Sequence, residues 1–236
     1  VAAEDADAGP AGNQPTWPGF RSLRVIRVVR EAAAVSSIYL GAPDGSPLPA
    51  ALAGQYLTLR IPGLARPAPV RSYSLSSAPG ADGYRISVKH EPHGTVSGYL
   101  TSTVRPGAVL DVAAPRGDFV LDHGTGPVLL ISAGIGVTPV ISMLHELAAG
   151  RSEREVWWIH GDRGPREQAL AVEARDLLAS LPHAHERVFW SKATSAERER
   201  GHAEPGRVTK AALAALGVPV AADAYICGPA SFMTDV

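Results

Sequence analysis

The sequence contains almost none of the residues that form covalent cross-links or cysteine-ligated metal sites. Cys227 is the only cysteine among the 236 residues. A single thiol excludes disulfide bonds within the chain, and it excludes zinc or iron–sulfur sites built from several cysteines of this chain. Proteins without disulfides are typical of a reducing compartment, so the sequence predicts a cytoplasmic protein.

The chain also lacks an excess of charge and any long apolar run. Its 22 basic and 23 acidic residues nearly cancel, and the basic residues are scattered along the sequence. Binding to nucleic acid would need a clustered positive excess, so we expect no nucleic acid partner. No apolar run approaches the roughly 20 residues of a membrane-spanning helix, and the first residues lack the pattern of a signal peptide. We therefore expect a globular protein that does not bind a membrane.

The two ends of the sequence predict a piece of a longer polypeptide. Residues 1–19 are rich in Ala, Gly, Asp and Pro, which is typical of a linker. At the other end the sequence stops at Val236, a few residues after a strand and turn, where a helix should only be beginning. The stretch between is long enough for two domains, and we expect the second to be truncated at its C-terminus.

Residues 20–123 predict an antiparallel β domain. Short apolar segments alternate with turns that contain Pro and Gly, which favours a small antiparallel barrel over a parallel sheet. One helix, predicted over residues 96–103, interrupts the series. The predicted strands cover residues 23–30, 35–40, 56–61, 70–75, 84–89 and 109–113.

Residues 124–236 predict a second domain, of α/β type. Strands that alternate with helices form a parallel sheet with helices on both faces, and ligands bind beyond the carboxyl ends of its strands. Gly134, Gly161 and Gly228 each follow a predicted strand end, so we expect them to converge on one edge of the sheet. The predicted strands cover residues 128–132, 156–160, 187–190 and 225–227, and the predicted helices cover residues 140–149, 166–181 and 208–216.

The stretch Val128–Ser142 predicts a nucleotide-binding turn. An aliphatic strand runs into Gly134 and Gly136, whose small size lets a ligand approach the backbone, and then into a helix whose free N–H groups suit a phosphate. Pro139 fits the first turn of that helix, and we expect Thr138 to cap it. Because Pro139 stands where the dinucleotide fingerprint has its third glycine, a turn that needs glycine only for packing is an equal alternative.

The segment Arg71-Ser72-Tyr73-Ser74 is the most informative part of the predicted barrel. Strand alternation places Arg71 and Tyr73 on one face and the two serines on the other. An arginine beside an exposed tyrosine suits a ligand that has an anionic group and a flat ring. The alternative is an ordinary edge strand with a solvated arginine.

Two further segments carry weaker signals. After Lys89, the turn at Gly94 leads into a short helix that Thr95 is expected to cap, and the start of this helix suits a phosphate. Cys227 ends the last predicted strand, where a cysteine is more often a small buried residue than a participant in chemistry. His160, at another strand end, is compatible with either a dinucleotide contact or a structural role, and no set of histidines predicts a metal site.

The order of four motifs, RSYS, GTVS, SAGIGVTP and YICGP, resembles the ferredoxin-NADP reductase superfamily, especially its flavohaemoglobin and oxygenase-reductase branch. The resemblance extends from about Phe20 to the end of the chain. It implies an antiparallel β-barrel flavin domain followed by an α/β parallel-sheet domain that binds a nicotinamide dinucleotide. The linker and its surroundings also resemble the reductase portion of fusions in which a MOSC domain precedes the reductase and a [2Fe-2S] ferredoxin follows it.

On the flavin side, the resemblance implies that Arg71 neutralises the flavin phosphates and that Tyr73 packs on the isoalloxazine ring. Ser74 is expected near the reactive nitrogen of the ring, which requires a local bend in the strand. The residues expected at the flavin phosphate are Gly94, Thr95 and Ser97, together with Lys89.

On the dinucleotide side, the resemblance implies that Gly134, Gly136, Thr138 and Pro139 shape the binding site. The residues expected close to the nicotinamide ring are Cys227, Gly228 and Pro229. Ser74 and Cys227 are accordingly the two expected catalytic residues.

The implied activity is that of an NAD(P)H-dependent flavoprotein reductase. Hydride would pass from nicotinamide to FAD, with FMN left open, and electrons would then leave singly to a ferredoxin or an oxygenase. A [2Fe-2S] cluster is expected only if a ferredoxin domain follows the chain. The branch favours NADH, although Ser191-Lys192, with Arg198 and Arg200 nearby, is compatible with the 2'-phosphate of NADPH. The alternatives are a flavin-binding regulatory module without coenzyme turnover, and a nucleotide-binding protein with an unrelated β domain.

Overall fold

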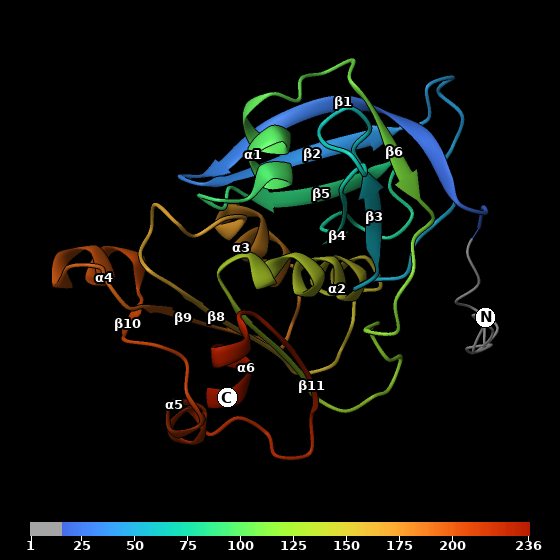
Figure 1. Ribbon diagram of the computed structural model, residues 1–236. Coiled ribbons are helices and arrows are strands. Elements are labelled where there is room, and N and C mark those ends of the chain that lie inside the picture. Colours follow the sequence, from blue (N-terminus) through green and yellow to red (C-terminus); the bar gives the residue numbers. More distant parts are fainter. Residues whose placement is uncertain (1–15) are drawn as a thin grey trace, which may run out of the picture.

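The computed structural model describes residues 16–236 and contains two sheets, one antiparallel and one parallel (Figure 1). The antiparallel sheet lies within residues 20–113 and the parallel sheet within residues 128–227. Most of the predicted linker lies outside the described residues. Within them, no helix has both the length and the apolar character to span a bilayer.

The antiparallel sheet has six strands in the order β4-β3-β6-β1-β2-β5. An antiparallel bridge between Leu75 and Ile86 joins the two edges of this sheet, so it closes into a barrel as predicted. The strands are β1 (Phe20–Ala32), β2 (Val35–Gly41), β3 (Tyr56–Arg60), β4 (Val70–Ser74), β5 (Tyr84–Lys89) and β6 (Val109–Ala113).

Alternating strand residues fill the barrel. Leu57 and Leu59 of β3 are fully buried, while the residues between them are only partly buried. Leu100 from α1 (Thr95–Ser102) packs into the same core. Each such side chain contributes roughly 1.5–3 kcal/mol through its removal from water, so the barrel has an apolar core of its own.

The second sheet has five strands in the order β10-β9-β8-β7-β11, and all its neighbouring strands are parallel. The strands are β7 (Val128–Ala133), β8 (Val156–Asp162), β9 (Ala184–Trp190), β10 (Glu204–Pro205) and β11 (Asp223–Cys227). This is the α/β parallel-sheet architecture that the sequence predicts. In β7, Leu130 faces one apolar cluster while Leu129 and Ile131 face another, because both faces of the sheet are covered.

Helices cover both faces of the parallel sheet. The two helices α2 (Val137–Ala149) and α3 (Ala171–Ala179) lie between this sheet and the barrel (Figure 1). On the opposite face, α5 (Lys210–Leu216) and α6 (Ala230–Asp235) pack against the second cluster. Three barrel-side residues, Val35, Ala53 and Leu121, belong to the same apolar cluster as α2, so this cluster extends from the α/β domain onto the barrel.

The structure differs from the sequence predictions in two helices. The helix predicted over residues 166–181 begins only at Ala171, because Leu170 adopts a left-handed conformation with φ of 59°. A further helix, α4 (Ser195–Gly201), was not predicted. Its signal was nevertheless present, since Thr194 and Glu197 form a reciprocal capping box.

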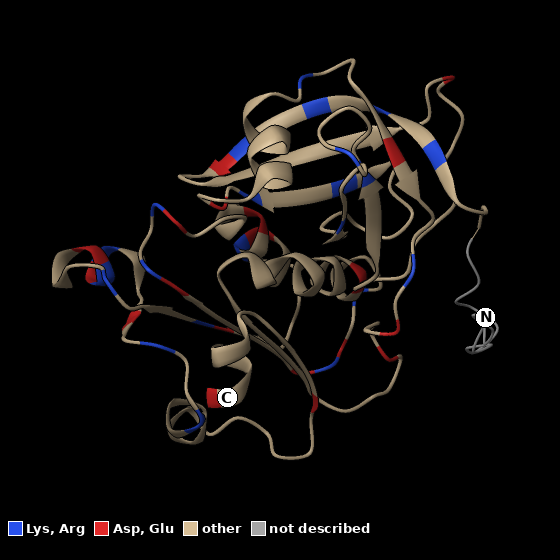
Figure 2. Ribbon diagram, viewed as in Figure 1, with Lys and Arg blue, Asp and Glu red and all other residues tan. Residues whose placement is uncertain are grey.

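Charged residues are interspersed over both domains (Figure 2). Strand β1 carries four arginines at intervals of three residues: Arg21, Arg24, Arg27 and Arg30. The even mixture of both signs elsewhere agrees with the scattered charges of the sequence.

Candidate cofactor-binding site

A cleft of about 720 Å³ lies between the barrel and the α/β domain. Its barrel wall comes from β4, from the end of β5 and from the start of α1, while its other wall comes from the ends of β7 and β11. All the site residues expected from the sequence line this cleft except Pro139, which is buried in the first turn of α2. Those that line it are Arg71, Tyr73, Ser74, Lys89, Gly94, Thr95, Ser97, Gly134, Gly136, Thr138, Cys227, Gly228 and Pro229.

Strand β4 brings an unpaired cation and an aromatic ring to the cleft. Arg71 is exposed and donates a hydrogen bond of 2.7 Å to the Val70 carbonyl, and no carboxylate within residues 16–236 forms an ion pair with it. Tyr73 packs partly against the barrel core, and burial raises the pKa of its phenol. The cleft therefore offers a free guanidinium and a neutral phenol side by side.

The two serines of β4 also line the cleft, although strand alternation places them on the opposite face. Ser72 hydrogen-bonds Thr58 on β3 through the two hydroxyls, at 3.0 Å. Arg71 and Tyr73 line the same cleft, so residues from both faces of β4 contribute to its lining. Ser74 is therefore part of the cleft lining, and its approach to the reactive nitrogen of a flavin stays a prediction.

The start of α1 is uncapped, contrary to the prediction for Thr95. Gly94 is the N-cap residue, and no side chain accepts a hydrogen bond from the first turn. Ser97 instead donates to the Gly94 carbonyl at 3.1 Å and accepts from the Glu91 N–H at 3.2 Å. The turn is so compact that a Cβ on Gly94 would lie 2.2 Å from Ser97 Oγ. The first N–H groups of α1 consequently remain available to an anion.

The glycine turn after β7 also leads into an uncapped helix. Gly134–Gly136 form one 3₁₀ turn, and α2 follows directly from Val137. Thr138 is therefore inside the helix, where its hydroxyl donates to the Ile135 carbonyl at 3.0 Å, so the prediction that Thr138 caps the helix was wrong. A second helix start without a side-chain cap thus borders the cleft.

The end of β11 packs directly on this turn. A Cβ on Gly136 would lie 2.2 Å from the Cys227 carbonyl oxygen, so only glycine permits the approach. Burial raises the pKa of the Cys227 thiol, which therefore stays protonated at neutral pH. Cys227 is half-buried and lines the cleft, so it contributes a small, neutral surface there.

Several residues singled out in the sequence lie elsewhere. His160 is only 1% exposed and bonds Ser132 at 2.9 Å, which supports its structural interpretation. Arg198 donates to the Ala193 carbonyl and to Ser195, while Arg200 lines a separate groove beside β9 and α4. Neither arginine lines the cleft.

Within residues 16–236, no group of three or more His, Cys, Asp and Glu side chains is arranged to hold a metal ion.

Other residues of the cleft were missed by sequence reasoning. Ser87 lies two residues before Lys89 on β5, and this spacing puts both on one face of the strand. The spacing in the sequence could therefore have identified Ser87 as a cleft residue. The cleft is also lined by residues to which the sequence reasoning assigned no cofactor role, including Glu91, His93, Val96, Ala133 and Ile135.

Two family profiles match the chain, one on each domain. The profile described as "Oxidoreductase FAD-binding domain" matches residues 42–121, and the one described as "Oxidoreductase NAD-binding domain" matches residues 130–236. The chain is also 40% identical over 237 aligned residues to the flavohemoprotein of Bordetella pertussis, covering 96% of this chain and 58% of that protein. Together the two matches give an oxidoreductase FAD-binding domain followed by an oxidoreductase NAD-binding domain, the domain pair of ferredoxin reductases. This reductase module spans little more than half the length of that curated relative.

Solved structures share the fold of the reductase module. A flavohemoglobin from Malassezia yamatoensis with bound FAD and heme has a TM-score of 0.79 at 26% identity, covering 92% of this chain and 55% of that one. The FAD/NAD-binding domain of a nitric oxide dioxygenase from Vibrio cholerae O1 biovar El Tor has a TM-score of 0.77 at 28% identity, covering 89% of this chain and 100% of that one.

The cleft has features that fit FAD and a nicotinamide dinucleotide. Its volume lies within the range of about 300–1,000 Å³ of small-molecule and cofactor sites. The two uncapped helix starts and the unpaired Arg71 suit phosphates, and Tyr73 suits a flat ring. A Cβ on Gly134 would meet nothing within 4 Å, so this glycine leaves space in front of the turn. The residues present therefore match the two cofactors of the family.

Proposed function

We propose that this chain oxidises NAD(P)H by hydride transfer to FAD and then passes the electrons singly to a one-electron acceptor, fused or separate. The observation that carries the proposal is the single cleft in which the barrel motifs and the dinucleotide motifs meet. When bound there, the flavin supplies the chemistry that joins a two-electron donor to a one-electron acceptor. The chain itself binds the two partners and excludes water.

On the barrel side, the proposed roles follow from charge and shape. Arg71 pairs with flavin phosphate, assisted by Lys89, whose only carboxylate neighbour among the ion pairs of residues 16–236 is Glu91 at 3.9 Å. The first turn of α1, formed by Gly94, Thr95 and Ser97, binds phosphate through its N–H groups. Tyr73 covers one face of the flavin ring with its neutral phenol, and Ser74 lies beside the reactive edge.

On the α/β side, the proposed roles concern the close approach of the dinucleotide to the backbone. Gly134 admits the dinucleotide to the backbone, and Gly136 with Thr138 and Pro139 sets the start of α2 behind it. Cys227, Gly228 and Pro229 border the nicotinamide ring. No side chain must take up or release a proton for direct hydride transfer, so the neutral thiol of Cys227 is suited to contact rather than to nucleophilic attack.

The proposed acceptor is a one-electron centre, and two kinds have support. The relative from Bordetella pertussis is named a flavohemoprotein, and the structure from Malassezia yamatoensis contains heme beside FAD, which favours a heme group. The resemblance to MOSC fusions favours an iron–sulfur acceptor. The cytoplasm is the proposed location, supported by the single cysteine of the sequence.

Anaerobic stopped-flow mixing of the FAD-loaded protein with NADH, and separately with NADPH, tests the reductase proposal. We expect the visible absorption of the flavin to bleach, and to return when heme-containing or iron–sulfur acceptors are added. Protein that binds FAD but stays oxidised with both coenzymes would support the regulatory alternative. Protein that does not bind FAD or FMN would contradict both.

A further inference from the structure

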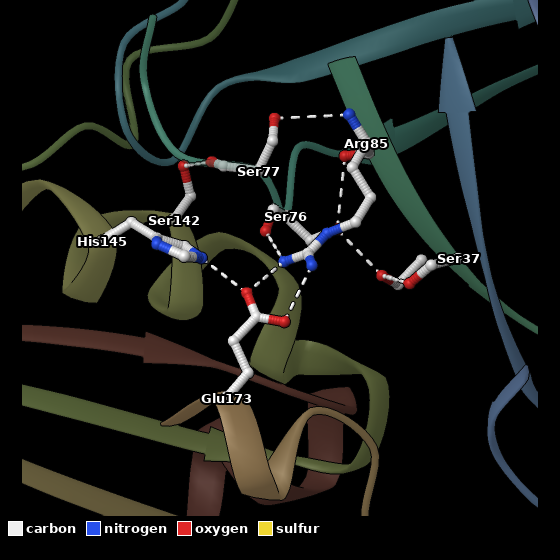
Figure 3. A network of polar contacts seen from close by, with 8 residues as sticks. Ser37, Ser76, Ser77, Arg85, Ser142, His145 and Glu173 are labelled. Atoms are coloured by element: carbon white, nitrogen blue, oxygen red, sulfur yellow. Dashed lines mark hydrogen bonds and ion pairs between the residues drawn. The ribbon is translucent and has the colours of Figure 1, made fainter. Parts of the chain in front are cut away.

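A buried ion pair crosses from the barrel to the α/β domain. The Arg85 side chain on β5 is only 7% exposed, and it donates two hydrogen bonds to Glu173 on α3, at 2.8 and 2.7 Å (Figure 3). The two residues are 88 positions apart in the sequence. This bidentate geometry restrains both the distance and the orientation of the two groups.

Helix α2 joins the same network. His145 approaches the Glu173 carboxylate at 2.5 Å, and Ser142, one turn earlier, donates to the Ser77 carbonyl at 2.9 Å (Figure 3). Ser77 lies in the connection between β4 and β5. The network therefore links two helices of one domain to β5 and to the β4–β5 connection of the other.

On the barrel side the network extends to the cofactor cleft. Arg85 Nε donates to Ser76 Oγ at 3.0 Å, and Ser76 Oγ bonds Ser87 Oγ at 2.8 Å. Ser87 lines the cleft, and Ser76 follows two residues after Ser74. A continuous chain of hydrogen bonds thus connects the barrel wall of the cleft, at Ser87, with Glu173.

On the other side the network is attached to the helix that starts in the dinucleotide turn. Ser142 and His145 lie on α2, which begins at Val137 directly after Gly134–Gly136. A helix transmits a displacement along its axis because its backbone is hydrogen-bonded throughout. The position of the turn relative to β4 therefore depends on these contacts.

The charges make the contacts specific. Burial opposes ionisation of Glu173, but hydrogen bonds from His145 and Arg85 outweigh it and lower its pKa to about 2. Burial likewise opposes the charge of Arg85, and the contacts with Glu173 outweigh it, which raises the pKa of the guanidinium. Removing one partner would leave a buried charge unpaired, so the pair favours one arrangement of the two domains.

We propose that Arg85, Glu173 and His145 are positioning residues that set the separation of the flavin and nicotinamide rings. They contact neither ring and act by holding β4 and β5 against α2 and α3. The inference rests on the proposed reductase function. It predicts an effect on the rate of hydride transfer that is larger than any effect on the binding of either cofactor.

The first experiment measures flavin reduction by NADH in the FAD-loaded Glu173→Gln variant. We expect the rate at saturating NADH to fall about tenfold, because a displacement of roughly 1 Å is enough to slow a transfer of this kind. The dissociation constant of FAD and the KM for NADH should stay within about twofold of wild type. His145→Gln, which removes one contact but keeps the ion pair, should reduce the rate in the same direction by a smaller factor.

Asp111→Asn is a control for the loss of an ion pair that does not join the two domains. Arg60 donates two hydrogen bonds to Asp111, at 3.2 and 2.9 Å, but this ion pair joins β3 to β6 within the barrel. We expect this control to keep the wild-type rate of flavin reduction. A rate loss equal to that of Glu173→Gln would show that loss of any ion pair has the same effect, and would overturn the proposal.

A second readout uses cofactor-free protein. Hydrogen–deuterium exchange should quicken in Glu173→Gln at the Ala33 amide, which donates across the domains to the Arg166 carbonyl at 2.8 Å, and at the Ser76 amide. If Glu173→Gln does not fold, His145→Gln provides both measurements.

Unchanged exchange together with an unchanged reduction rate would overturn the positioning role while leaving the reductase function intact. Wild-type protein that binds FAD but is not reduced by either coenzyme would instead contradict the proposed function, and the exchange result would still report on the network.

Discussion

Gly134 and Gly136 stand two residues apart in one turn, and each requires glycine for a different reason. Gly134 has a left-handed φ of 53°, and a Cβ there would meet nothing within 4 Å. Gly136 has an ordinary φ of −61°, but a Cβ there would lie 2.2 Å from the Cys227 carbonyl oxygen. The first position therefore serves backbone conformation and ligand access, while the second serves packing between α2 and β11.

Substituting each glycine by alanine separates the two roles. We expect Gly136→Ala to lower the free energy of unfolding by roughly 2–3 kcal/mol, because backbone atoms must move to admit the methyl group. Gly134→Ala should lower it by only about 1 kcal/mol, from left-handed strain, but should raise the KM for the coenzyme. Urea unfolding and steady-state kinetics check both expectations. Equal losses of stability would contradict the distinction.

Arg71 is the residue on which flavin affinity should depend most. Arg71→Ala removes an exposed cation without an ionic partner among the described residues, so we expect FAD to bind roughly ten- to a hundredfold more weakly with little change in stability. Fluorescence titration of the cofactor-free protein with FAD measures the change. Arg24→Ala, on β1, removes the same charge from the same barrel outside the cleft and should leave FAD affinity unchanged.

At the scale of elements, the pairing of β5 with α3 should make stability depend on acid pH. Glu173 has a folded-state pKa of about 2, below its ordinary value of 4.5. A carboxylate with a lowered pKa stabilises the fold above its unfolded-state pKa, and this contribution is lost as the pH falls from 4.5 towards 2. The groups that face it are Arg85 of β5 and His145 of α2, and Tyr39 of β2 lies beside Arg85.

Urea unfolding of wild type and Glu173→Gln tests this expectation. At about pH 7 we expect wild type to be more stable by up to about 3 kcal/mol, and at about pH 3 by no more than half of that difference. The difference in the free energy of unfolding between wild type and Glu173→Gln should therefore become smaller as the pH falls. A gap that stays constant between the two pH values would show that Glu173 does not titrate as its contacts require.

At the scale of the whole molecule, residues of both domains line one cleft. The two domains also share an apolar cluster. A ligand that contacts both domains opposes their separation as well as the unfolding of either. The cofactor should therefore stabilise the barrel and the α/β domain together. Such coupling is expected where Val35, Ala53 and Leu121 already pack with α2.

Thermal unfolding with FAD checks this coupling. At a free FAD concentration of about 100 times the dissociation constant, the free energy of unfolding should rise by about 2.7 kcal/mol. We expect one transition whose midpoint increases with FAD concentration, and a smaller increase for Arg71→Ala at the same concentration. An increase confined to one of two separate transitions would contradict coupled domains.

The sequence by itself determined most of the elements, though not α4 or β10, and the order of the cofactor motifs. The alternation of β3 and the Gly-rich turn after β7 are local patterns, so they predict strand, turn and helix without knowledge of the rest of the chain. Local signals were less reliable at helix starts. Thr95 and Thr138 are of a residue type that favours N-cap positions, yet both lie inside their helices. The N-cap position is occupied by a preceding glycine, Gly94 in α1 and Gly136 in α2.

Only the tertiary structure decided which distant residues meet. Arg85 and Glu173 occur in segments that read as an ordinary strand and an ordinary helix, and nothing within either segment indicates a partner 88 residues away. Ser72 likewise lines the same cleft as Gly134 and Cys227, which belong to the other domain. Contacts of this kind depend on how two folded domains are placed against each other, whereas turns and periodicity depend only on neighbouring residues.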